Sequence, residues 1–204
     1  MTVNLSHFSE PPSEREVLRY ALKNILTDYA EEHQALPFDA TDPDLDTLTG
    51  HRINFGGNYS QLVARLDNRF DGTSFEVNSD DHLDIDDLQE VFSNPTASYP
   101  LVEVHPELYE YQAQKDESPE TYVIQRGHHD ETLVPLLIPF SVEEGSVFYY
   151  DPFLDYYSPK NTPSQKISRG LFIELWGRCD LTSWALWIDQ GQQRTLMDVN
   201  EAQS

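Results

Sequence analysis

The apolar residues of this chain change their spacing once, near Pro95, and this change restricts the folds that the sequence can adopt. Before that point, apolar residues recur every three or four positions, which is the spacing of helices that pack on one face. After it, short apolar runs bounded by turn residues are typical of strands. Helices that precede strands in this way predict an α+β protein with a mostly antiparallel sheet.

Three segments of the first half predict helices. Residues 13–33 begin with a capping box, in which Ser13 is followed three residues later by a glutamate, and they continue with an apolar face. The residues of that face are Val17, Leu18, Ala21, Leu22, Ile25 and Leu26. Residues 58–70 and 83–94 predict two further helices, and Asp84 is the expected cap of the second.

The second half predicts strands and one more helix. The expected strands are 101–104, 121–127, 133–141, 145–152 and 183–190, with an earlier short strand at 73–77, and the expected helix is 168–179, started by Ser168. The stretch 142–145 suits a tight hairpin turn. We therefore expect a single domain over 1–204, with a helical part at about 13–93 and a sheet part at about 98–190.

The charge of the chain restricts its partners and its surroundings. The sequence holds 36 acidic and 13 basic residues, which gives a net charge of -23. Such a charge repels nucleic acid and anionic membranes, and no apolar run is long enough to cross a bilayer. Because acidic residues occur in nearly every loop, we favour adaptation to a salt-rich cytoplasm over a concentrated mimic of nucleic acid. The first residues carry no basic or apolar signal segment, so we expect a cytoplasmic protein.

Three stretches resemble the C39-like branch of the papain-like cysteine peptidases. They are "LDIDDLQEVFSNPTASYPLVEVHPE", "LVPLLIPFSVEEGSVFYYDPF" and "ISRGLFIELWGRCDLTSWALWI". The first is similar to the short helix and first strand of the family's β half, the second to the strands that carry its His and Asp, and the third to its closing helix and strand. The resemblance implies a papain-like fold, and the scarcity of lysine relative to arginine resembles haloarchaeal proteins.

The resemblance also implies where a catalytic site would lie. In the family, a cysteine at the start of the first helix is the nucleophile, a histidine takes its proton, and an aspartate orients that histidine. Here the first helix starts without a cysteine, Cys179 is the only thiol, and Pro135 stands near the position of the histidine. Asp151, in an Asp-Pro pair, is the one residue that matches, so it is interpreted as a relic of the site. A plain turn residue before proline is the alternative.

Two other residues are candidates for a recruited catalytic role. Ser13 offers a hydroxyl at the start of the first helix, although its role as a helix cap fully explains it and serine needs a positioned base. His129, next to His128, offers such a base or a metal ligand, with a solvated loop as the alternative. No third ligand is recognisable from the sequence, so we expect no metal and no other cofactor.

Aromatic residues gather around the Asp-Pro pair and indicate a binding groove. The residues expected to line it are Tyr149, Tyr150, Phe153, Tyr156 and Tyr157. The alternative is that these rings cover the sheet beneath the loop that follows.

Three hypotheses for the function follow. The first is a non-catalytic C39-like domain that binds a peptide or a partner protein in its former substrate groove. The second is an active hydrolase or transferase in which Ser13 or His129 has been recruited. The third is an acidic inhibitor or immunity-type protein that binds a basic partner, an association that molar salt would screen.

Overall fold

The computed structural model describes residues 14–32, 45, 47–49, 59–108, 111, 135–152, 165–179 and 182–190, without the side chains of 14–17, 28 and 30–32. The helices of this part are α1 (Glu14–Glu32), α3 (Ser60–Phe70), α4 (Ile85–Ser93) and α8 (Arg169–Gly177). The strands are β1 (Phe75–Asp80), β2 (Leu101–Glu103), β3 (Leu136–Glu143), β4 (Ser146–Tyr150), β5 (Gln165–Ser168) and β6 (Ala185–Gln190).

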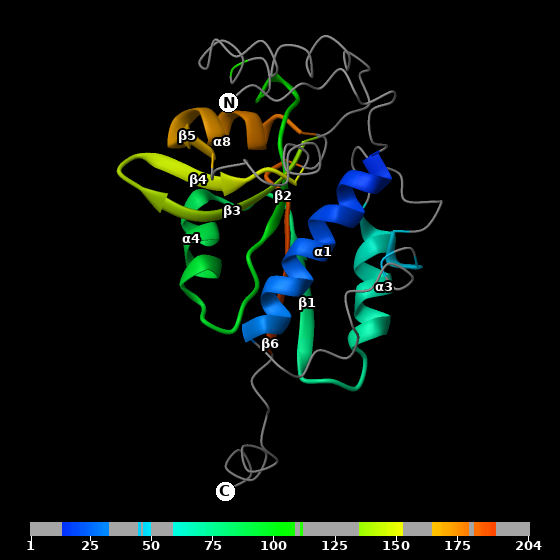
Figure 1. Cartoon of the computed structure of the whole chain (residues 1–204). Coiled ribbons are helices and arrows are strands. Elements are labelled where there is room, and N and C mark those ends of the chain that lie inside the picture. The colour runs from blue at the N-terminus through cyan, green and yellow to red at the C-terminus, as the bar shows by residue number, and fades with distance from the viewer. Residues whose placement is uncertain are drawn as a thin grey trace, which may run out of the picture.

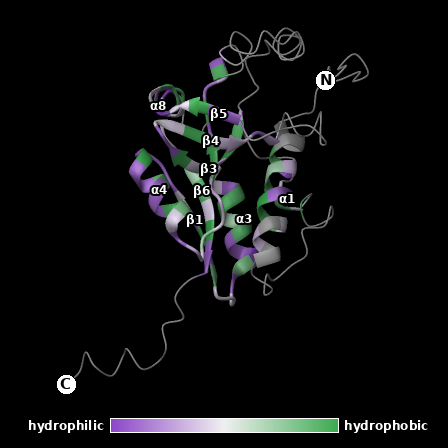
Figure 2. Cartoon of the chain, turned by 60° about the vertical axis from the view of Figure 1, so that its left-hand side comes forward, coloured by the Kyte–Doolittle hydropathy of each residue, from purple (hydrophilic) through white to green (hydrophobic). Residues whose placement is uncertain are grey.

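The six strands form one sheet in the order β1-β6-β2-β3-β4-β5, in which every neighbouring pair is antiparallel. Helices α1 and α3 pack on one face of the sheet, and α4 and α8 pack on the other (Figure 1). Figure 2 shows the sheet between α4 on one side and α1 with α3 on the other. The predicted α+β class with an antiparallel sheet is therefore confirmed.

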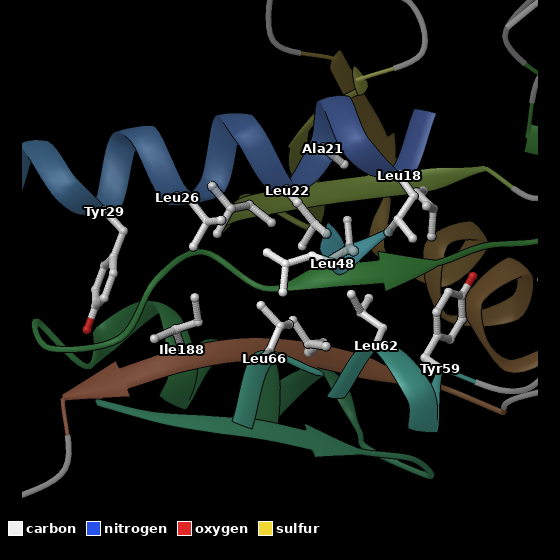
Figure 3. Packing of buried hydrophobic residues seen from close by; sticks show 14 of the residues in the cluster. Leu18, Ala21, Leu22, Leu26, Tyr29, Leu48, Tyr59, Leu62, Leu66 and Ile188 are labelled. Carbon is white, nitrogen blue, oxygen red and sulfur yellow. The ribbon is translucent and has the colours of Figure 1, made fainter. Parts of the chain in front are cut away.

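Helix α1 forms because its apolar residues return to one face at intervals of three and four positions. The buried residues of this face are Leu18, Ala21, Leu22, Ile25, Leu26 and Tyr29. In Figure 3, Leu18, Leu22 and Leu26 of this face point toward Leu62 and Leu66 of α3 and toward Ile188 of β6. At the end of this cluster nearest Leu18, Tyr59 stacks on Trp184 with ring centroids 4.1 Å apart. This first core cluster fixes α1 across the sheet.

The second core cluster lies under α4 and α8, and both helices start as the sequence predicts. Asp84 caps α4 by accepting hydrogen bonds from two backbone amides of the first turn, within a full capping box. Ser168 caps α8 by accepting from the amide of Leu171 at 3.4 Å. The buried residues Phe172, Leu175 and Trp176 then turn toward the sheet.

The sheet contains strands from both the predicted helical part and the predicted sheet part of the chain. Strand β1 lies within the part expected to be helical, yet it pairs along its whole length with β6, the last strand. The expected hairpin turn is present, since Glu144 and Gly145 have φ values of 50° and 77°, as a two-residue type I′ turn requires. The sequence pattern does not predict β5, and the expected strand 121–127 lies outside the described residues.

Candidate functional site

The position that matches the peptidase pattern lies at the end of β4. Asp151 follows that strand directly and is fully buried. Ile138 of β3 pairs with Tyr150, so Asp151 lies beside the first residues of β3. Pro135, which precedes β3, is also buried, and its carbonyl accepts a hydrogen bond from the amide of Val104 at 3.0 Å. Pro135 therefore joins β3 to the chain beyond β2 and offers no group that could exchange a proton.

A second buried carboxylate lies on the other side of β3. Glu103, the last residue of β2, is 2% exposed and pairs with Leu136. The sequence analysis did not single it out, although a glutamate inside the apolar stretch "LVEV" was the available signal. Burial of two acids, Glu103 and Asp151, at the same end of one sheet is unusual, because a buried charge is costly unless it is paired and hydrogen-bonded.

The only thiol of the sequence does not lie at the start of the first helix. Cys179 follows α8, on the face of the sheet opposite α1. Its Sγ lies 3.5 Å from the carbonyl oxygens of both Glu103 and Leu175, and its single S–H can donate to either. Cys179 is half-buried, and these contacts link the end of α8 to the end of β2.

The aromatic residues expected to form a groove separate in the structure. Tyr149 is fully buried in the second core cluster, because alternation along β4 turns it toward α8, so its expected place in an open groove is wrong. Tyr150 is half-buried and packs against the first cluster, where its hydroxyl accepts a hydrogen bond from Asn24 Nδ2 at 3.4 Å. The other candidates lie outside the described residues: Ser13, His129, Phe153, Tyr156 and Tyr157.

A pocket of about 120 Å³ lies elsewhere, between the C-terminal half of α1 and the connection from α4 to β2. Among its lining residues are Ile25 and Tyr29 of α1, Phe92 of α4, and Asn94, Ser98 and Tyr99 of the connection. Tyr99 is 45% exposed and stands at the surface of this pocket. The pocket thus combines apolar walls, a few polar groups and an exposed aromatic ring, which are common properties of binding sites.

The ladder between β2 and β3 ends close to Tyr99, which lines the pocket. These strands pair at Val102 with Leu137 and at Glu103 with Leu136. Continued in the same register, the ladder would bring Pro100 opposite Pro139. Neither proline has an N–H to donate, so the ladder stops there.

One residue further along, the two chains meet through side chains. The rings of Tyr99 and Phe140 make an edge contact with centroids 6.3 Å apart. Phe140 also marks the point where the register between β3 and β4 shifts, as in a β-bulge, which bends β3 away. We call the segments 97–100 and 139–141, where the pairing of β2 and β3 has ended, the wedge. The prolines at both positions were the available sequence signal for this interruption.

A hydrogen-bonded group of polar side chains holds the connection beside the pocket. Asp189 of β6 accepts from Asn94 Nδ2 at 2.8 Å and from Thr96 Oγ1 at 2.6 Å. The hydroxyl of Tyr29 donates to the Thr96 carbonyl at 2.6 Å. Burial, followed by the nearby charge of Asp189, raises the pKa of the Tyr29 hydroxyl above its ordinary value of 10.0. Tyr29 therefore remains a neutral donor and ties α1 to the connection.

The comparisons with known proteins add no family to this picture. A scan against models of protein families finds no match, and a search of curated proteins finds none either. Among the described residues, no group of three or more His, Cys, Asp or Glu side chains is placed to hold a metal ion. In the same part of the chain, no helix is long and apolar enough to span a membrane.

Proposed function

We propose that this chain is a non-catalytic domain of the C39-like, papain-like type that binds an extended peptide or a segment of a partner protein. The observation that carries the binding role is the pocket beside Tyr99, which lies where the sheet is interrupted. The position of Cys179 supports the absence of thiol chemistry, because the only thiol of the sequence is engaged with two carbonyl oxygens beyond α8. Helix α1 starts at Glu14, without a cysteine nearby.

The distribution of charge supports a binding domain adapted to salt more than a mimic of nucleic acid. Exposed acids lie on elements in several directions, and Asp67 of α3, Glu76 of β1, Asp87 of α4 and Glu174 of α8 are examples. A mimic would be expected to collect its carboxylates on one face. The proposed setting is a salt-rich cytoplasm, in which charge attraction is screened and apolar contacts supply most of the affinity.

The proposal is tested by selection of peptides from a random display library in molar KCl, followed by mass spectrometry of the selected peptides after prolonged incubation with the protein. The expected result is saturable binding of peptides that stay intact. Variants Ser13→Ala, His129→Ala and Cys179→Ala serve as controls for catalysis. Cleavage that any of these changes abolishes in a folded protein would establish the recruited-enzyme hypothesis instead. Binding only in dilute buffer would favour the acidic inhibitor.

A further inference from the structure

We infer that the wedge is the peptide site, and that its occupant is an extended segment of a basic partner protein that inserts one apolar side chain into the pocket under α1. This inference rests on the proposed binding function and specifies its place and ligand class. The proposed site lies at the end of α1 near Tyr29, whereas the nucleophile of the peptidase pattern would lie at the start of the helix.

The backbone of the wedge offers hydrogen-bonding groups to an added strand. On one side, 96–98 is already held to β6, since Ser98 donates to the Ile188 carbonyl at 2.7 Å and Gln190 donates to the Thr96 carbonyl at 3.1 Å. Ala97 forms a bridge with Asp189 in which the Ala97 carbonyl points away from β6. Within the described residues, the Tyr99 amide donates no hydrogen bond. An extended peptide can pair with these groups, as in strand addition to a sheet edge.

The pocket sets the size of the anchoring side chain. A cavity of 150 Å³ with apolar walls holds a benzene molecule, so about 120 Å³ suits a leucine or isoleucine side chain. Ile25 and Phe92 provide apolar walls from opposite faces of the sheet, and the exposed Tyr99 also lines the pocket. The Tyr29 hydroxyl is already bonded to the Thr96 carbonyl, so it needs no partner from the anchor.

Charge selects a basic partner. The chain carries a net charge of -23, and β3 leads from the wedge to Glu143 and Glu144 at the hairpin tip, both exposed. Lysine or arginine on either side of the anchor would meet these carboxylates, whereas acidic flanks would be repelled. A second copy of the chain brings the same negative charge, which disfavours self-association at this site.

The test uses a labelled nine-residue peptide of alternating serine and lysine with leucine at its centre, measured by fluorescence anisotropy in molar KCl. We expect saturable binding, and about tenfold or greater weakening when the central leucine becomes alanine, because the pocket then loses most of its apolar contact. In dilute buffer a peptide with aspartate in place of lysine should bind more weakly, and in molar KCl this difference should nearly vanish while the dependence on leucine remains.

Two protein variants and a matched control locate the site. Tyr99→Ala removes an exposed aromatic wall of the pocket, and Ala97→Leu fills the pocket. Each variant should therefore weaken binding about tenfold or more. Tyr111→Ala removes a tyrosine of similar exposure, 38%, that does not line the pocket, and it should bind as the parent does. Because Ala97→Leu risks misfolding, each variant is checked by thermal unfolding. Slower hydrogen exchange at the Tyr99 amide in the bound state gives an independent readout on the unmodified chain.

The outcomes separate the two proposals. If the leucine peptide, or a peptide from the display selection, binds both variants as well as the parent and leaves exchange at Tyr99 unchanged, the wedge is not the site, but the binding function stands. If no peptide from either source binds, both proposals are wrong. If sedimentation shows that the wedge variants change the mass of the protein alone, the occupant is a second copy, and the inference of a basic partner is overturned.

Discussion

The link between α1 and the α4–β2 connection makes a quantitative prediction for the variant Tyr29→Phe. The substitution keeps the ring, which is 3% exposed and makes an edge contact with Phe75 at 5.8 Å. It removes one hydrogen bond, from the hydroxyl to the Thr96 carbonyl at 2.6 Å. That carbonyl keeps a second partner, the Gln190 amide at 3.1 Å, so no buried acceptor is left without a donor. We therefore expect a loss of about 1 kcal/mol in the free energy of unfolding at neutral pH.

At high pH the difference in free energy of unfolding between the parent and Tyr29→Phe should shrink and then change sign. Because the folded pKa of Tyr29 is raised above 10.0, its stabilising effect is fully present below pH 10 and is lost as the pH rises from 10 toward the folded value. At pH 11 the unfolded tyrosine is mostly ionised while the folded one is neutral, which costs the parent about 1.4 kcal/mol that Tyr29→Phe does not lose. The two proteins should then be nearly equal in stability, or the variant slightly more stable.

The measurement is chemical denaturation of both proteins at pH 7, 9, 10 and 11 in the same molar salt. The other tyrosines titrate in both proteins, so the difference between the two curves isolates position 29. Parallel curves over the whole range would refute the reasoning, because they would mean that the Tyr29 hydroxyl ionises equally easily in the folded and unfolded states. A difference of several kcal/mol at pH 7 would also refute it, since loss of one satisfied hydrogen bond cannot supply that much.

Four further predictions follow from the core, the caps and the charges. The melting temperature should rise from dilute buffer to molar KCl, because salt screens the repulsion within a chain of charge -23, and a value indifferent to salt would contradict this. Leu66→Ala should cost about 2–5 kcal/mol in denaturation experiments, since Leu66 is fully buried between α1 and α3. Asp84→Ala should cost about 1 kcal/mol, a fall of about 2–4 °C in melting temperature, whereas Asp84→Asn should retain most of the cap. The hydrogen bond from Arg178 lowers the pKa of Glu107 below 4.5, so Glu107→Gln should lose slightly less stability than the parent as the pH falls from 4.5, and identical acid titrations would exclude the effect.

The helices and the hairpin could be predicted because their signals are local. The apolar face of 13–33 returns every three or four residues, and Asp84 and Ser168 offer side-chain oxygens at the starts of α4 and α8. The hairpin follows from glycine at a position with positive φ. In each case the residues that decide the structure lie within a few positions of one another, so no knowledge of the tertiary fold is needed.

The wedge and the burial of Tyr149 depend on partners that are distant in sequence. Pro100 and Pro139 interrupt the sheet only because β2 and β3 are neighbours, which no local pattern reveals. Tyr149 faces the core because α8 covers that side of β4, and without α8 the same alternation would place it in solvent. Strand β5 is short and polar, and it is recognised through its pairing with β4, not through its own residues. Tertiary context overrides a weak local preference at each of these sites.

The two ends of α1 therefore differ in the functional features that lie near them. Near Leu18 the helix approaches the region where the peptidase pattern would require a nucleophile, but the sequence supplies its only thiol beyond α8. Near Tyr29, about 16 Å further along at 1.5 Å per residue, the helix lines a pocket that also includes the exposed Tyr99, next to the two prolines where the ladder of β2 and β3 ends. Neither proline contributes to catalysis, and both weaken the sheet by removing ladder hydrogen bonds. Because the ladder ends there, backbone groups of 97–99 are left for the added strand that we propose, and this is the physical basis of the proposal.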